Sequence, residues 1–183
     1  MPVLIAAVVL LAVIVVLNLA VTVAVLGRLR TRTRGHTGPR PDGPGGLARG
    51  AALPAFAAPA VDGTIVGPDT FAGRRTLVGL FATSCPGCAD AAPAFAAWAA
   101  RLADADVATV AVLATGPGED GGELVGILTK VGTLVVERRP GAVMDAFGAQ
   151  ITPSYFLVDA TGRIERKGLT WEECLPAVPV GHG

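Results

Sequence analysis

The sequence predicts an α/β domain, a mixed sheet flanked by helices, preceded by one N-terminal transmembrane helix. Three observations support this prediction. Residues 3–26 form a nearly unbroken apolar run. Farther along the chain, apolar runs of strand length alternate with segments of helix length, which is typical of a sheet covered by helices. Between one such run and a helical segment stands Cys85-Pro86-Gly87-Cys88.

The N-terminal apolar run is long enough to cross a membrane. As a helix, residues 3–26 would span roughly 36 Å, and a hydrocarbon core is about 30 Å thick. A cleaved signal peptide is the alternative, but the basic segment that begins such a peptide is missing and the apolar run is too long. We therefore expect residues 1–27 to be a single-pass anchor in the cell membrane.

Residues 28–50 are rich in Arg, Gly and Pro, and this composition predicts a flexible linker. Its arginines follow the apolar run closely, so the positive-inside rule would place the C-terminal part in the cytoplasm. A dithiol domain is most useful where disulfides persist, which favours the extracytoplasmic side. These two signals disagree, and we expect the extracytoplasmic placement.

Residues 51–176 are expected to form the folded domain, and residues 177–183 a C-terminal tail. Within the domain, Asp62-Gly63 between short apolar pieces predicts a β-hairpin. Strands are expected at residues 76–82, 107–114, 133–136, 155–158 and 163–166, and helices at residues 89–103, 124–131, 142–147 and 171–175. The first of these strands is apolar throughout, which predicts burial on both faces.

Charge and cysteine content exclude some classes of function. The formal net charge is zero, so nothing indicates a nucleic-acid partner. Three cysteines cannot all pair within one chain, and Cys85 with Cys88 is the economical pair. We expect Cys174 to be a structural, half-buried thiol, with an intermolecular disulfide as the alternative. The protein is expected to be monomeric.

Two cysteines separated by two residues, at the junction of a strand and a helix, predict a redox-active dithiol. The first cysteine lies where a helix leaves backbone N–H groups without intrahelical partners. Those donors and the helix dipole favour a thiolate over a thiol. The second cysteine returns on nearly the same helical face. Cys85 is therefore the expected nucleophile and Cys88 the resolving thiol.

Several motifs together resemble the membrane-anchored thioredoxin-like proteins. They are Leu53-Pro54-Ala55-Phe56, Val61-Asp62-Gly63-Thr64, the dithiol with its preceding strand, and Ile151-Thr152-Pro153-Ser154-Tyr155-Phe156-Leu157-Val158-Asp159 with Gly162. The chain is most similar in pattern to TlpA/ResA-type thiol-disulfide oxidoreductases and to the accessory protein of methylamine dehydrogenase maturation. The resemblance implies a thioredoxin-like fold and disulfide exchange with the thiols of an unidentified partner protein. Such an exchange needs no cofactor, and we expect neither a cofactor nor a metal.

The resemblance also implies roles for two residues far from the dithiol in sequence. Pro153 would be the family's cis-proline facing the dithiol, and the backbone of Thr152 would pair with the substrate polypeptide. The ordinary alternative is a trans proline that ends a loop. Many thioredoxins carry a buried acid six residues before the first cysteine, and here that position is Gly79. The sequence names no general base in its place.

Three other functions remain open from the sequence. A peroxiredoxin-like antioxidant enzyme would share the fold. In such enzymes a threonine stands three residues before the nucleophilic cysteine, and the corresponding residue before Cys85 is Ala82. A redox-silent binding module with a thioredoxin fold is the second alternative, and the missing acid at Gly79 favours it. A zinc site is the third; Cys85 and Cys88 would need Cys174 and His182 as further ligands.

Overall fold

The computed structural model describes residue 15, residues 45–102 and residues 107–175. The two longer ranges belong to one compact unit. The predicted anchor (residues 1–27, apart from residue 15), the linker as far as residue 44 and the predicted tail (residues 177–183) lie outside the described residues. Across the described ranges, no helix combines the length and the apolar character needed to cross a bilayer.

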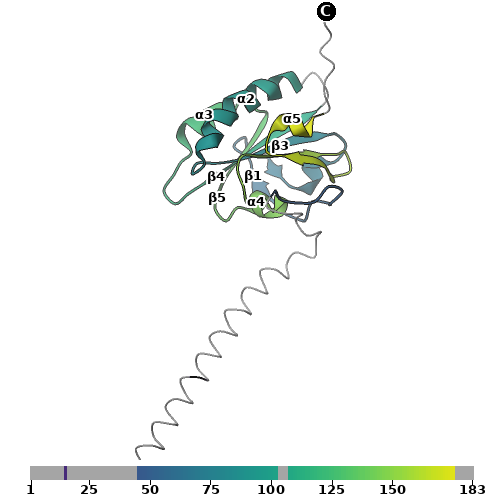
Figure 1. The fold of residues 1–183 in the computed structure, drawn as a ribbon, viewed down its shortest axis with the longest axis horizontal. Coiled ribbons are helices and arrows are strands. Elements are labelled where there is room, and N and C mark those ends of the chain that lie inside the picture. The colour runs from purple at the N-terminus through teal and green to yellow at the C-terminus, as the bar shows by residue number, and fades with distance from the viewer. Residues whose placement is uncertain (1–14, 16–44, 103–106, 176–183) are drawn as a thin grey trace, which may run out of the picture. The chain divides into compact units, whose positions relative to one another are not determined.

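A five-stranded mixed sheet forms the centre of the domain (Figure 1), with the strand order β5-β4-β3-β6-β7. Its strands are β3 (Thr76–Ala82), β4 (Ala108–Thr115), β5 (Thr133–Arg138), β6 (Ser154–Val158) and β7 (Ile164–Gly168). Strands β3, β4 and β5 are parallel to one another, whereas β6 runs antiparallel to β3 and β7 antiparallel to β6. The predicted mixed sheet is therefore confirmed.

A second, two-stranded sheet precedes the main one. Strands β1 (Ala58–Pro59) and β2 (Ile65–Val66) pair antiparallel on either side of the turn that contains Asp62 and Gly63. Gly63 has a φ of 85°, a conformation that glycine adopts without steric cost. The predicted hairpin is confirmed.

Helices cover both faces of the main sheet, as Figure 1 shows. On one face lie α2 (Pro86–Leu102), α3 (Gly122–Leu128) and α5 (Trp171–Cys174). On the other lie α4 (Ala142–Phe147), the short 3-10 helix η1 (Pro68–Phe71) and the segment that enters the domain from the N-terminal side. Each layer encloses its own apolar cluster.

Strand β3 is central because it divides these two clusters. All seven of its residues are buried, as its continuous apolar sequence predicts. Leu77 and Phe81 point into the cluster under α2, whereas Val78 and Leu80 point into the cluster above α4. The end of β3 positions the dithiol, because the chain passes from Ala82 through a short turn into α2.

The folded domain begins before the predicted boundary at residue 51. Leu47 is 5% exposed and its N–H donates to the Phe147 carbonyl at 2.8 Å. Gly46, with a φ of 89°, lies so close to Phe147 and Phe156 that an added Cβ would meet their atoms at 2.6 and 2.7 Å. Residues 45–50, which the sequence assigned to the linker by composition, are thus packed against the domain.

Candidate active site: a dithiol at the start of a helix

A tight turn places Cys85 immediately before α2. The Thr83 N–H donates to the Ala114 carbonyl at 3.1 Å, which joins the turn to β4. The Cys85 N–H donates to the Ala82 carbonyl at 3.2 Å and closes the turn. Helix α2 then begins at Pro86, where a proline needs no intrahelical hydrogen bond and has a suitable φ. Helix α2 therefore starts three residues earlier than the predicted 89, and Cys88 lies in its first turn.

The two thiols differ in their access to solvent. Both are reduced; Cys85 is partly exposed and Cys88 is fully buried. The Cys88 N–H donates to the Cys85 carbonyl at 3.1 Å, so the two residues share the first turn of the helix. The Cys88 sulfur accepts a hydrogen bond from the Ala82 N–H at 3.5 Å. Only Cys85 is placed to meet a second protein molecule.

The surroundings push the pKa values of the two thiols apart. Partial burial acts to raise the pKa of Cys85, but hydrogen bonds from the Cys88 thiol, the Thr152 side chain and the backbone N–H groups of Cys88 and Gly87 outweigh it, so the pKa lies below its ordinary value. Burial, followed by the hydrogen bond to Cys85, raises the pKa of Cys88 to about 12. Cys85 is thus the thiol that ionises first.

The segment that begins β6 faces the dithiol. The Thr152-Pro153 peptide bond is cis, in agreement with the prediction for Pro153. The Cys85 thiol donates to the Thr152 carbonyl at 3.0 Å. A Cβ added to Gly87 would lie 3.9 Å from Pro153 Cδ, so the proline packs beside the first turn of α2. The structure therefore brings together all four residues that the sequence singled out, although Cys85 and Thr152 are 67 positions apart along the chain.

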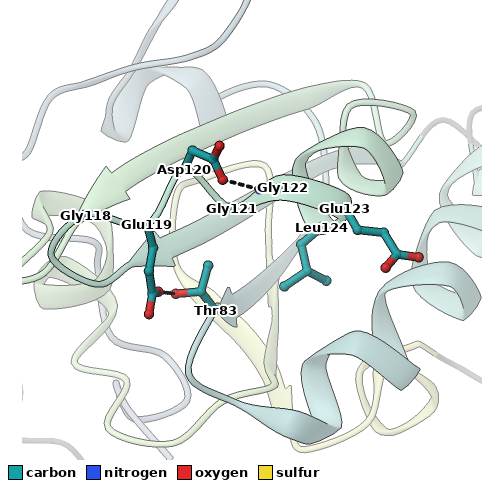
Figure 2. A pocket seen from close by; sticks show the side chains of 8 residues that line it. All are labelled: Thr83, Gly118, Glu119, Asp120, Gly121, Gly122, Glu123 and Leu124. Carbon is teal, nitrogen blue, oxygen red and sulfur yellow. Dashed lines mark hydrogen bonds between the residues drawn. The ribbon is translucent and has the colours of Figure 1, made fainter.

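A carboxylate that the sequence analysis missed lies beside the turn. Glu119, in the loop after β4, accepts hydrogen bonds from the Thr83 hydroxyl and, at 3.0 Å, from the Gly116 N–H. These bonds hold the pKa of Glu119 below its ordinary value. Figure 2 shows Glu119 pointing at Thr83, at one end of a shallow hollow that continues past Asp120 to α3. A loop of glycines and acids gave no periodic signal from which this contact could be predicted.

Behind the dithiol, the cluster under α2 contains two more polar side chains. Cys174 is fully buried rather than half-buried, and its thiol donates to the Tyr155 carbonyl at 3.3 Å. Burial raises the pKa of Cys174 to about 12. The ring of Tyr155 packs against Phe95 and Phe81, and its hydroxyl has no hydrogen-bond partner. Trp98 and Trp171 pack on each other at 4.7 Å between ring centroids, in keeping with the structural role expected for both.

Metal ligands do not gather in the described part of the chain. Within residues 45–102 and 107–175, no group of three or more His, Cys, Asp and Glu side chains is arranged to hold an ion. His182, which the zinc alternative requires, lies outside the described residues.

A mixed sheet that presents a Cys-x-x-Cys dithiol at a helix start, opposite a cis-proline, defines the class of thioredoxin-like thiol-disulfide oxidoreductases. The Redoxin family profile matches residues 48–173. The chain therefore belongs to the Redoxin family, and it is a thiol-disulfide oxidoreductase whose dithiol is Cys85 and Cys88.

Solved structures with the same fold come from several bacteria. The thioredoxin domain of a thiol-disulfide oxidoreductase from Bacteroides vulgatus superposes with a TM-score of 0.57 at 20% identity, over 69% of this chain and 92% of that one. A putative thioredoxin from Neisseria meningitidis gives 0.51 at 26% identity, over 64% and 78%. A putative thiol:disulfide interchange protein DsbE from Chlorobium tepidum gives 0.55 at 22% identity, over 72% and 89%. Among curated proteins, none matches significantly.

Proposed function

We propose that this protein exchanges disulfides with partner proteins while tethered to a membrane by its N-terminal segment. The observation that carries the proposal is that the two thiols of the dithiol differ in both exposure and pKa. Cys85 is partly exposed and its pKa is lowered, whereas Cys88 is buried and its pKa is raised to about 12. An accessible thiolate next to a protected thiol is what a two-step exchange requires.

The exchange proceeds in two steps. The Cys85 thiolate attacks one sulfur of a partner disulfide, forms a bond to it, and displaces the other sulfur as a thiolate. Cys88 then loses its proton to solvent and attacks the Cys85 sulfur, so the bond between Cys85 and the partner breaks. The partner leaves as a dithiol, the chain keeps a Cys85–Cys88 disulfide, and two electrons have passed to the partner. Run in reverse, the same steps oxidise a partner dithiol.

The partner polypeptide is proposed to lie along the start of β6. The carbonyl of Thr152 is already 3.0 Å from the Cys85 sulfur, so a chain bound there meets the nucleophile. Ile151, the residue before Thr152, is 40% exposed and offers an apolar contact to such a chain. Thr152 and Pro153 are thus the proposed substrate-binding residues.

The membrane placement rests on the sequence. The apolar run at residues 3–26 supports a single-pass anchor, and the composition of residues 28–44 supports a tether between anchor and domain. We place the domain on the extracytoplasmic side, where partner disulfides persist. The TlpA/ResA-type proteins that the sequence resembles have the same order of membrane anchor, linker and dithiol domain. Reporter fusions after residue 44 test the side directly, and reporter activity on the cytoplasmic side would reject this part of the proposal.

A trapping experiment tests the exchange itself. The full chain with Cys88→Ser lacks the resolving thiol, so it should accumulate mixed disulfides with its partners through Cys85. Mixed disulfides should be absent from the matched Cys85→Ser variant and unaffected by adding Cys174→Ser to the trap. A folded, reduced Cys88→Ser variant that forms no mixed disulfide with protein disulfides would reject the proposed function.

A further inference from the structure

An unpartnered hydroxyl lies in the same apolar cluster as the resolving thiol. Tyr155 on β6 is 1% exposed, and its hydroxyl is the one fully buried side-chain oxygen or nitrogen in the described ranges that has no hydrogen-bond partner. Its ring packs against Phe95 and Phe81 at 5.5 and 5.9 Å between centroids, directly under α2. Buried polar groups are rarely left without partners, so an orphan of this kind calls for a functional explanation.

The cluster offers Cys88 no carboxylate. Among the buried residues of the apolar cluster under α2, only Cys88, Cys174 and Tyr155 carry a polar side-chain group, and no Asp or Glu is buried in the described ranges. On β3, the residue paired with Tyr155 is Gly79, where an added Cβ would meet the rings of Phe81 and Phe95 at 2.8 Å. Aromatic rings therefore fill the space that an acid at residue 79 would need.

Tyr155 and Cys88 belong to the same buried cluster under α2. Burial is the main cause of the raised pKa of Tyr155, and the charge of Cys88 is the next. The other groups that act on the phenol are Glu172 and Cys174 on α5, and Cys85. A phenol whose pKa is raised stays protonated at neutral pH, so Tyr155 is available as a hydrogen-bond donor and not as a base. Cys174 donates to the Tyr155 carbonyl and leaves the hydroxyl free.

We propose that the Tyr155 hydroxyl donates a hydrogen bond to the Cys88 thiolate during resolution, directly or through one water, in place of a buried acid. The inference rests on the proposed function. Cys88 gives its proton to solvent, the resulting thiolate attacks the Cys85 sulfur, and the partner sulfur leaves as a thiolate that solvent protonates. Tyr155 keeps its own proton throughout. It acts by stabilising the anion, because a donor to a charged form favours that form.

Single-turnover kinetics with glutathione disulfide as the oxidant separate the two steps. In the reduced full chain, attack by Cys85 releases the first glutathione, and resolution by Cys88 releases the second. Tyr155→Phe removes only the oxygen and keeps the ring contacts. We expect it to leave the first release unchanged, to slow the second about tenfold at neutral pH, and to move the pH profile of the second step up by about one unit.

Cys174→Ala is the matched control, because it removes the other polar side chain of the cluster and leaves the phenol in place. It should keep the wild-type rates and pH profile in both steps. If Tyr155→Phe resolves at the wild-type rate with the wild-type pH profile, or if Cys174→Ala slows resolution equally, the inference is overturned. A wild-type chain that forms the glutathione adduct and never resolves it would instead reject the proposed function.

Discussion

Replacement of Gly79 by alanine should destabilise the domain, because β3 has no room for a methyl group at this position. An ideal Cβ there would lie 2.8 Å from Phe81 Cε2 and 2.8 and 2.9 Å from two ring atoms of Phe95. Ordinary carbon contacts are about 3.5–4.0 Å long, so both rings must shift by most of an ångström. Both are fully buried, and each also packs against Tyr155. Overpacking of this kind costs about 1–3 kcal/mol.

Urea unfolding followed by tryptophan fluorescence measures this cost. Trp98 and Trp171 are the only tryptophans in the chain, and both lie in the folded domain. Gly126→Ala is the control: Gly126 is exposed on α3 and an added Cβ meets nothing within 4 Å. That variant should gain about 0.5–1 kcal/mol from helix propensity. If Gly79→Ala were as stable as the wild type, the reasoning that aromatic rings exclude a side chain at residue 79 would be wrong.

Two further predictions concern the helix opposite the dithiol and the buried thiols. The Glu137 carboxylate accepts the N–H groups of Val143 and Met144 at 3.0 and 2.9 Å, so Glu137→Gln should lower the free energy of unfolding by roughly 1–2 kcal/mol; an unchanged urea midpoint would contradict this. Cys88 and Cys174, whose pKa values are raised from 9.0 to about 12, bind their protons more tightly in the folded state. The unfolded chain releases these protons first, so the stability of the reduced protein should fall as pH rises from about 9 towards 12, whereas a Cys174→Ala variant should show a shallower fall.

The sequence was sufficient to predict the fold because the three central strands, β3, β4 and β6, are predominantly apolar. Strand β3 has the bounds that its composition predicts, and β6 differs by one residue. The start of α2 was misplaced at residue 89 because Pro86-Gly87 is typical of a turn, although proline is also common in the first turn of a helix. The linker boundary was misplaced for a related reason. Gly45 and Gly46 are typical of a flexible segment by composition, but Gly46 packs against two buried phenylalanines.

The site was predictable where local chemistry specifies it. Two cysteines at a strand–helix junction indicate which one is the nucleophile and which one resolves the mixed disulfide. The motif around Pro153 indicated the segment that faces the dithiol. Contacts between residues far apart in sequence could not be predicted. The hydrogen bond from Thr83 to Glu119 depends on how an irregular loop returns to the sheet. Whether the buried Tyr155 hydroxyl has a hydrogen-bond partner likewise depends on which residues the fold packs around it.

The most direct test of the central claim is the pH dependence of alkylation at Cys85 in the reduced full chain, with the modified cysteine identified by mass spectrometry. Because hydrogen bonds at the start of α2 hold the pKa of Cys85 below its ordinary value, Cys85 should react alone and with a midpoint below that of an unperturbed thiol. The buried Cys88 and Cys174 should stay unmodified while the domain is folded. A midpoint for Cys85 at or above the ordinary thiol value, or faster labelling of Cys88, would contradict the account.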